Sequence, residues 1–153
     1  MNTDSYSQDK VVDFLVENFI PVRSQCFFDH FTAMMRRYQV KWTPTFVVLD
    51  PDGREHHRVV GFLPPEDFMA QLQLGKAKLY YDQDRLDKAA SEIQIVIDRF
   101  PQAAAAEEAI FLLGVSGYKR THQAGELKKA WERLSRDYPA SEWSKRARPY
   151  SAL

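Results

Sequence analysis

The stretch RYQVKWTPTFVVLDPDG, residues 37–53, decides how the first half of this chain folds. Its centre, TFVVLD (45–50), is a continuous apolar run, which predicts a strand buried on both faces. The DPDG that follows (50–53) has proline second and glycine last, the composition of a type I turn. REHHRVVGF (54–62) then returns, so the stretch predicts a hairpin.

Two helices and one further strand are predicted upstream of this hairpin. Ser7 is placed to cap a helix that runs to about Asn18. FIPVR (19–23) predicts a short strand, and its proline favours an edge position or a strand start. FFDHFTAMMRRY (27–38) carries aromatic and methionine side chains at helical spacing, which predicts a second helix with a core-facing stripe.

The second half is predicted to be helical throughout. Pro64-Pro65 opens a helix at about residue 65, and no strand pattern follows Gly61. Residues 74–101 and 113–139 resemble one another as helix, polar break, helix and an aromatic-proline stop. Their Leu-Gly pairs lie 39 residues apart and their closing prolines 38 apart. This predicts a helical-hairpin repeat of the tetratricopeptide kind, slightly longer than the usual period of about 34 residues.

The sequence also predicts close helix contacts and one helix cap in the second half. Small residues fall where paired helices are expected to cross closely, at Gly75, Ala89, Gly114 and Ala130. Ser141 is placed to cap a last short helix, SEWSKRA.

Composition excludes several classes of protein. The 21 basic and 21 acidic residues cancel, so no basic field favours nucleic acid or an anionic membrane. The longest apolar runs, such as residues 45–49, are too short to span a bilayer. MNTDSYSQDK has no signal-peptide pattern, which favours a cytoplasmic location.

The residue types that make metal, cofactor or redox sites are sparse. Cys26 is the one cysteine of the sequence, which excludes an internal disulfide and a CxxC pair within this chain. His56 and His57 alternate in direction on a predicted strand, so we expect surface histidines there instead of metal ligands. No pattern for a metal or a cofactor is found, and we expect neither.

The first half, about residues 1–72, resembles the C-terminal two-thirds of a thioredoxin fold. The resemblance rests on YQVKWTPTFVVLDPDG (38–53), which is similar to the family's cis-proline segment, and on the returning strand that ends at Gly61. The opening MNTDSY looks like the part of the family's helix that lies just beyond its CxxC. In bacterial proteins such domains also occur fused to helical tails of repeat character.

The resemblance implies half of a redox site. Thr43 and Pro44 match the cis-proline loop that offers backbone groups to a substrate strand, with Trp42 beside them as a contact residue or as filler of space. The family's cysteine pair has no counterpart in this chain. Cys26 falls on the connection after the 19–23 strand and has no second thiol to resolve a mixed disulfide, so we expect it to be inert.

The resemblance also implies a missing central strand, because the family's second strand lies between its third and fourth. Three outcomes are open: the remaining strands close up, two copies pair or exchange elements, or the natural protein starts earlier with a CxxC. An apolar strand makes a poor bare edge, so we expect a dimer.

The sequence therefore predicts an α/β protein with an incomplete thioredoxin-like sheet, made of the hairpin plus one further strand, and an all-α tail. The units expected are residues 1–72 and 73–153. The favoured function is a non-catalytic interaction module that binds protein or peptide and associates with itself. The alternative is a thiol-disulfide oxidoreductase whose CxxC lies upstream.

Overall fold

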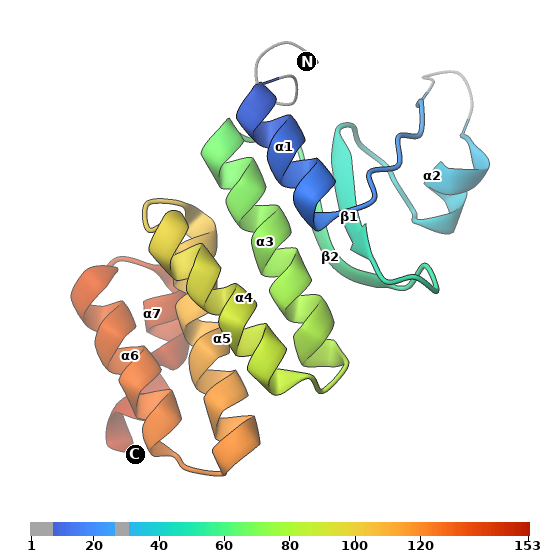
Figure 1. Cartoon of the computed structure of the whole chain (residues 1–153). Coiled ribbons are helices and arrows are strands. Elements are labelled where there is room, and N and C mark those ends of the chain that lie inside the picture. The colour runs from blue at the N-terminus through green and yellow to red at the C-terminus, as the bar shows by residue number, and fades with distance from the viewer. Residues whose placement is uncertain (1–7, 27–30) are drawn as a thin grey trace.

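The computed structural model describes residues 8–26 and 31–153, which form seven α-helices, a 3-10 turn and one two-stranded sheet. The hairpin lies against one side of a long helix, α3 (Pro65–Asp82), and further helices stack on its other side (Figure 1). The predicted combination of a small sheet and an all-helical tail is observed.

The hairpin forms as its sequence predicts. β1 (Thr45–Leu49) and β2 (Glu55–Val60) pair antiparallel. In the turn, the Gly53 amide donates to the Asp50 carbonyl at 2.9 Å, and the Asp50 carboxylate accepts from the amides of Asp52 and Arg54. Gly53 has φ +78°, a conformation that glycine adopts without steric cost.

The pairing contains a β-bulge next to the turn. Val48 lies opposite His57, but the next residue, Leu49, lies opposite Glu55, so His56 is the extra residue on β2. A bulge interrupts the alternation of side chains, and this changes where the two histidines point.

The predicted further strand at 19–23 is not formed. Residues 19–26 have no regular secondary structure and pair with no described strand, and Ile20 and Val22 are 92% and 77% exposed. Their β-branched side chains favour a strand, yet a strand needs a neighbour for its backbone, and Pro21 lacks an amide hydrogen.

Both predicted helices of the first half are found, and the second is shorter than expected. α1 covers Asp9–Asn18 with Gln8 at its N-cap; Ser7, the predicted cap, lies outside the described residues. Of the helix predicted over 27–38, α2 forms at Ala33–Arg37, and residues 27–30 lie outside the described part.

The reason for the short α2 is local. The Thr32 hydroxyl accepts from the Met35 amide at 3.2 Å and starts the helix there, while Gln39, at φ +50°, ends it. Met35 is buried and Tyr38 half-buried, whereas Phe31 and Met34 are exposed, so two of the four described members of the predicted core stripe do not face the core.

The helical half follows its prediction closely. Pro65 is in the first turn of α3. Two helical hairpins are formed, one by α3 with α4 and one by α5 with α6. The Ser141 hydroxyl accepts from the Trp143 amide at 3.0 Å and caps the last α-helix. The elements after α3 are α4 (Leu86–Arg99), α5 (Ala104–Thr121), α6 (Gly125–Asp137), α7 (Glu142–Ala147) and a 3-10 turn (Arg148–Ala152).

The small residues serve two different contacts. A Cβ on Gly114 would lie 2.5 Å from the Cβ of Ala130, so α5 and α6 do cross closely there. Gly75 instead faces the hairpin, where an added Cβ would meet Val48 at 2.7 Å and His57 at 3.0 Å. The prediction that Gly75 marks a helix-helix crossing is wrong, because this face of α3 packs against the sheet.

Helix α3 joins the two halves. It extends through the predicted boundary at residues 72 and 73 and packs on the hairpin, on α1 and on both α4 and α5. Phe68 on α3 is fully buried, with its ring centroid 4.7 Å from that of Phe46 on β1. The core therefore runs without interruption from the hairpin into the tail.

Candidate functional site

The three residues predicted to bind a partner lie together at the start of β1. The Gly61 amide donates to the Pro44 carbonyl at 2.8 Å, and the Thr45 hydroxyl donates to the Trp42 carbonyl at 2.6 Å. The Thr43–Pro44 peptide bond is cis, as the resemblance implies. These bonds hold the loop at the mouth of the strand.

Trp42 fills no space in the core. Its side chain is 70% exposed, and Val60 and Phe62, at the end of the neighbouring strand, are about half exposed. Val60 lies opposite Thr45 on the sheet. Trp42 and Phe62, which flank the Pro44–Gly61 pair in the sequence, are what we call the apolar rim.

One edge of β1 is free of strand pairing. In an antiparallel pair, residues that bond to the partner strand alternate with residues whose amide and carbonyl point the other way. The Pro44–Gly61 bond fixes this alternation, so Thr45 and Val47 direct their backbone groups away from β2. Within residues 8–26 and 31–153, β2 is the one strand that pairs with β1.

Cys26 is not brought to this loop by any hydrogen bond among the described residues. It is a partly buried free thiol on the segment between α1 and α2, and its sulfur lies 3.9 Å from the Ser24 carbonyl oxygen. The structure thus groups Trp42, Thr43 and Pro44 and leaves Cys26 on a separate segment.

The two histidines of β2 are a feature that the sequence analysis missed. The side chain of His56 is 2% exposed, with Nδ1 2.7 Å from Asp82 and Nε2 3.1 Å from Asp50. His57 bonds through Nε2 to Gln71 at 2.8 Å, and Nδ1 lies 3.2 Å from the Lys78 ammonium. The prediction of surface histidines is wrong because the bulge lets two consecutive residues both reach α3.

The surroundings shift the pKa values of these rings in opposite directions. Burial lowers the pKa of His56, but the hydrogen bonds and charges of Asp82 and Asp50 outweigh burial, so its pKa is raised. Burial and the charge of Lys78 lower the pKa of His57. The pKa of the Asp50 carboxyl is lowered, first by the Arg54 amide and then by His56. Together these groups fasten the turn end of the hairpin to α3.

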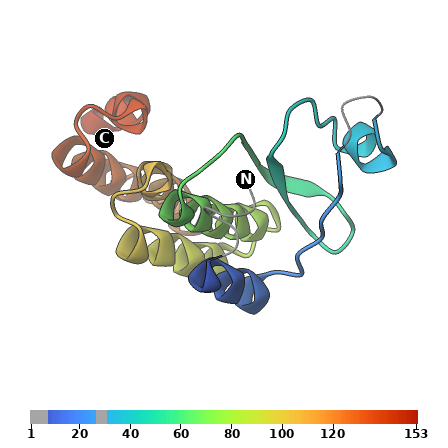
Figure 2. The same cartoon turned by 90° about the horizontal axis from the view of Figure 1, so that it is seen from above.

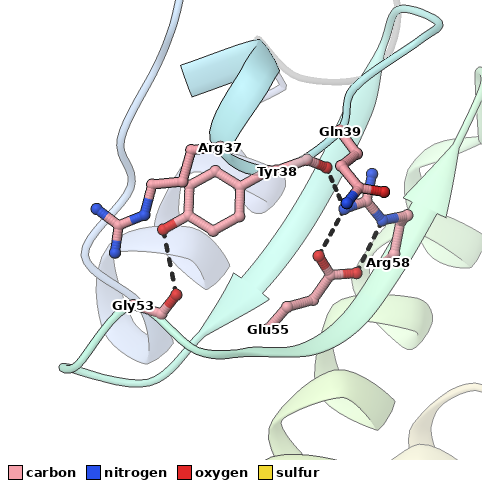
Figure 3. A pocket seen from close by; sticks show the side chains of 6 residues that line it. All are labelled: Arg37, Tyr38, Gln39, Gly53, Glu55 and Arg58. Atoms are coloured by element: carbon pink, nitrogen blue, oxygen red, sulfur yellow. Dashed lines mark hydrogen bonds and ion pairs between the residues drawn. The ribbon is translucent and has the colours of Figure 1, made fainter. Parts of the chain in front are cut away.

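A shallow hollow of about 630 Å³ opens on the other face of the hairpin (Figure 3). Its polar groups bond to one another: the Arg58 guanidinium donates to Glu55 at 2.8 Å and to the Tyr38 carbonyl at 2.6 Å. The Tyr38 hydroxyl donates to the Gly53 carbonyl at 3.2 Å. The hollow is lined by Arg37, Tyr38, Gln39, Gly53, Glu55 and Arg58. Because its polar groups are largely satisfied internally, it serves to fix the end of α2 on the hairpin.

The described residues contain neither a candidate metal cluster nor a helix suited to span a membrane. No cluster of three or more histidine, cysteine or acidic side chains in residues 8–26 and 31–153 is placed to hold a metal ion. No helix in this part of the chain combines the length and the apolar character needed to cross a membrane.

Comparison with known proteins gives one match. The sequence model of the family described as "Thioredoxin-like domain" matches residues 3–76. No curated protein and no solved structure matches. The match extends from before α1 into the middle of α3, and so covers the loop, the hairpin and the free edge of β1.

Proposed function

We propose that this chain, whose residues 3–76 are a thioredoxin-like domain, is a non-catalytic module that binds an extended protein segment and associates with itself. The observation that carries the proposal is the free edge of β1. An unpaired, apolar strand edge is a template for another strand, and adding a strand to a sheet edge is a common mode of peptide recognition.

The residues of the edge suit this role. β1 consists of five residues, TFVVL, and none of them has a charged side chain that would prevent another strand from pairing with the edge. The apolar rim lies at one end of the edge and offers Trp42, which is 70% exposed, to the side chains of an added strand. Backbone hydrogen bonds then supply affinity, and the rim supplies preference for apolar residues.

Charge supports self-association. With 21 basic and 21 acidic residues the chain has a formal net charge of zero, so two copies approach without overall repulsion.

The cysteine content supports a non-catalytic role. Thiol-disulfide exchange by one cysteine produces a mixed disulfide with the substrate, and a second thiol is needed to attack that bond and release the reduced product. Cys26 is the one thiol in the sequence.

Proline at Val47 tests the proposal. Val47→Pro removes an amide hydrogen from the free edge and leaves the amides that bond to β2 in place. We expect the wild-type chain to be a dimer by size exclusion with light scattering, and Val47→Pro to shift it towards the 17.8 kDa monomer.

Val60→Pro is the matched control. Val60 lies opposite Thr45 in the same kind of pair, so its amide points away from β1, to the opposite side of the sheet. We expect this variant to dimerise as the wild type does. A wild-type monomer at all concentrations, or equal loss in both variants, overturns the assignment to β1.

The second candidate function is a thiol-disulfide oxidoreductase whose CxxC lies upstream of Met1. The Thr43-Pro44 pair at the strand mouth favours it, since it matches the substrate-binding half of such a site. An in-frame Cys-x-x-Cys encoded just upstream of Met1, together with insulin reduction by the extended chain, would favour this candidate over our first proposal.

A further inference from the structure

We infer that the strand received by the free edge of β1 is residues 19–23 of a second copy, given reciprocally, so that two chains form one closed pair. This inference rests on the proposed function and names the partner of the same site.

The donor segment lies outside every helix and strand of the described residues. α1 ends where the Phe19 amide donates to the Leu15 carbonyl at 2.8 Å, and the Phe19 ring centroid lies 6.0 Å from that of Phe14. From Ile20 onward the segment leaves this anchor and runs towards α2 (Figure 2). Ile20 and Val22 are 92% and 77% exposed. Two β-branched apolar side chains are suited to a sheet and are exposed to water here.

Donor and acceptor match in length and in chemistry. The segment FIPVR and the strand TFVVL each supply five residues, and Arg23 is the single charged side chain of the two stretches. Among the described residues, neither the outward backbone groups of Thr45 and Val47 nor those of Ile20 and Val22 pair with a strand, and the same chain contains both. A contact between copies therefore satisfies both sites at once.

Pro21 fixes which residues of the donor face β1. In an extended strand, backbone amides point to alternate sides, so the facing set is either Phe19, Pro21 and Arg23 or Ile20 and Val22. Proline has no amide hydrogen and is found where its nitrogen faces away from the ladder. Ile20 and Val22 therefore donate to the partner's β1, and their side chains lie on one face of the enlarged sheet.

Reciprocal exchange closes the assembly. Each chain gives one segment and receives one, so the two contacts are related by a two-fold axis and both are used in the pair. The expected product is a dimer that does not grow into longer polymers.

A pair of proline variants in the donor tests the register. Val22→Pro removes a facing amide from an exposed, irregular segment, and we expect the dissociation constant of the dimer to rise at least about tenfold. Arg23→Pro places the same residue one position on, where the amide faces away, and we expect dimerisation to be preserved. Loss in both variants, or in neither, overturns the register.

Mixing two defective chains tests the exchange itself. The Val22→Pro chain keeps its acceptor edge, and the Val47→Pro chain keeps its donor segment. We expect each to be monomeric alone and the equimolar mixture to give a heterodimer by native mass spectrometry, since one of the two exchanges remains.

The outcomes separate this inference from the proposed function. If Val47→Pro is monomeric but Val22→Pro dimerises as well as the wild type, the β1 edge still carries self-association and residues 19–23 are not the donor. If the mixture stays monomeric, the reciprocal exchange is wrong. If the wild type itself is a monomer, the proposed self-association fails first.

Discussion

Gly114 and Gly125 mark two extremes of what an added methyl group meets in the helical half. At Gly114 the methyl would lie 2.5 Å from the Cβ of Ala130, whereas at Gly125 no heavy atom lies within 4 Å. We expect Gly114→Ala to lower the free energy of unfolding by about 1–3 kcal/mol because α5 and α6 must move apart. Gly125→Ala should be neutral or raise it by about 0.4–1 kcal/mol through the unfolded chain. Urea denaturation of both variants checks this; equal effects would contradict the close crossing.

At this scale the sequence predicts which positions need small residues but not what they contact. Gly75 and Gly114 occupy equivalent places in the two blocks, 39 residues apart. One faces the hairpin and the other a helix, because α3 is the helix on which the sheet packs. Spacing along one chain carries no information about which neighbour fills the space.

Among the elements, the hairpin is held to α3 by bonds that depend on protonation. When a histidine has a higher pKa in the folded state than in the unfolded state, its protonation stabilises the folded state. The contribution of His56 is therefore complete below its unfolded pKa of about 6.5 and is lost as pH rises through the higher folded value. We expect His56→Gln to lose more stability at pH 5.5, where the ring is protonated, than at pH 8.5.

His57→Gln provides the contrast. The pKa of His57 is lowered in the fold, so the folded state favours the neutral ring, and the native contribution of His57 is lost as pH falls below about 6.5. Denaturant unfolding at both pH values measures the two variants side by side. Equal penalties for His56→Gln at the two pH values would mean that its bonds to Asp50 and Asp82 are not coupled to its proton.

Elements were predictable where the signal is local. The hairpin follows from an apolar run and a DPDG turn, and α7 follows from a serine that caps it. A strand was predicted at 19–23 and is not formed, because strand pairing depends on a neighbour that the sequence of five residues does not specify. The cis-proline loop was predictable from its resemblance to a family, while the histidine pair needed the bulge at His56.

At the scale of the whole molecule, α3 couples the sheet to the tail. Its Lys76 forms an ion pair with Glu92 on α4 at 3.1 Å, and its Lys78 pairs with Glu108 on α5 at 2.6 Å. The same helix also buries Phe68 against the hairpin. Neither half keeps a complete core without this helix, so we expect the chain to unfold in one transition.

Tryptophan fluorescence tests this cooperativity. Trp42 reports on the loop before β1, and Trp131 and Trp143 report on α6 and α7. The Trp42→Phe variant keeps Trp131 and Trp143, so its fluorescence reports on the tail. The double variant Trp131→Phe/Trp143→Phe keeps Trp42, so its fluorescence reports on the loop. We expect each variant's fluorescence midpoint in urea to coincide with its own far-UV circular dichroism midpoint. Separate midpoints would mean that the halves unfold independently.

The end of the helical stack has a practical consequence. Trp143 and Tyr150 lie against Phe111, with ring centroids 5.1 and 5.9 Å from that of Phe111, and Leu153 is half exposed. The C-terminus is on the opposite side of the molecule from the hairpin (Figure 1). A fluorescent protein fused after Leu153 therefore leaves the β1 edge accessible, and two colours of fusion would report pairing in living cells through energy transfer.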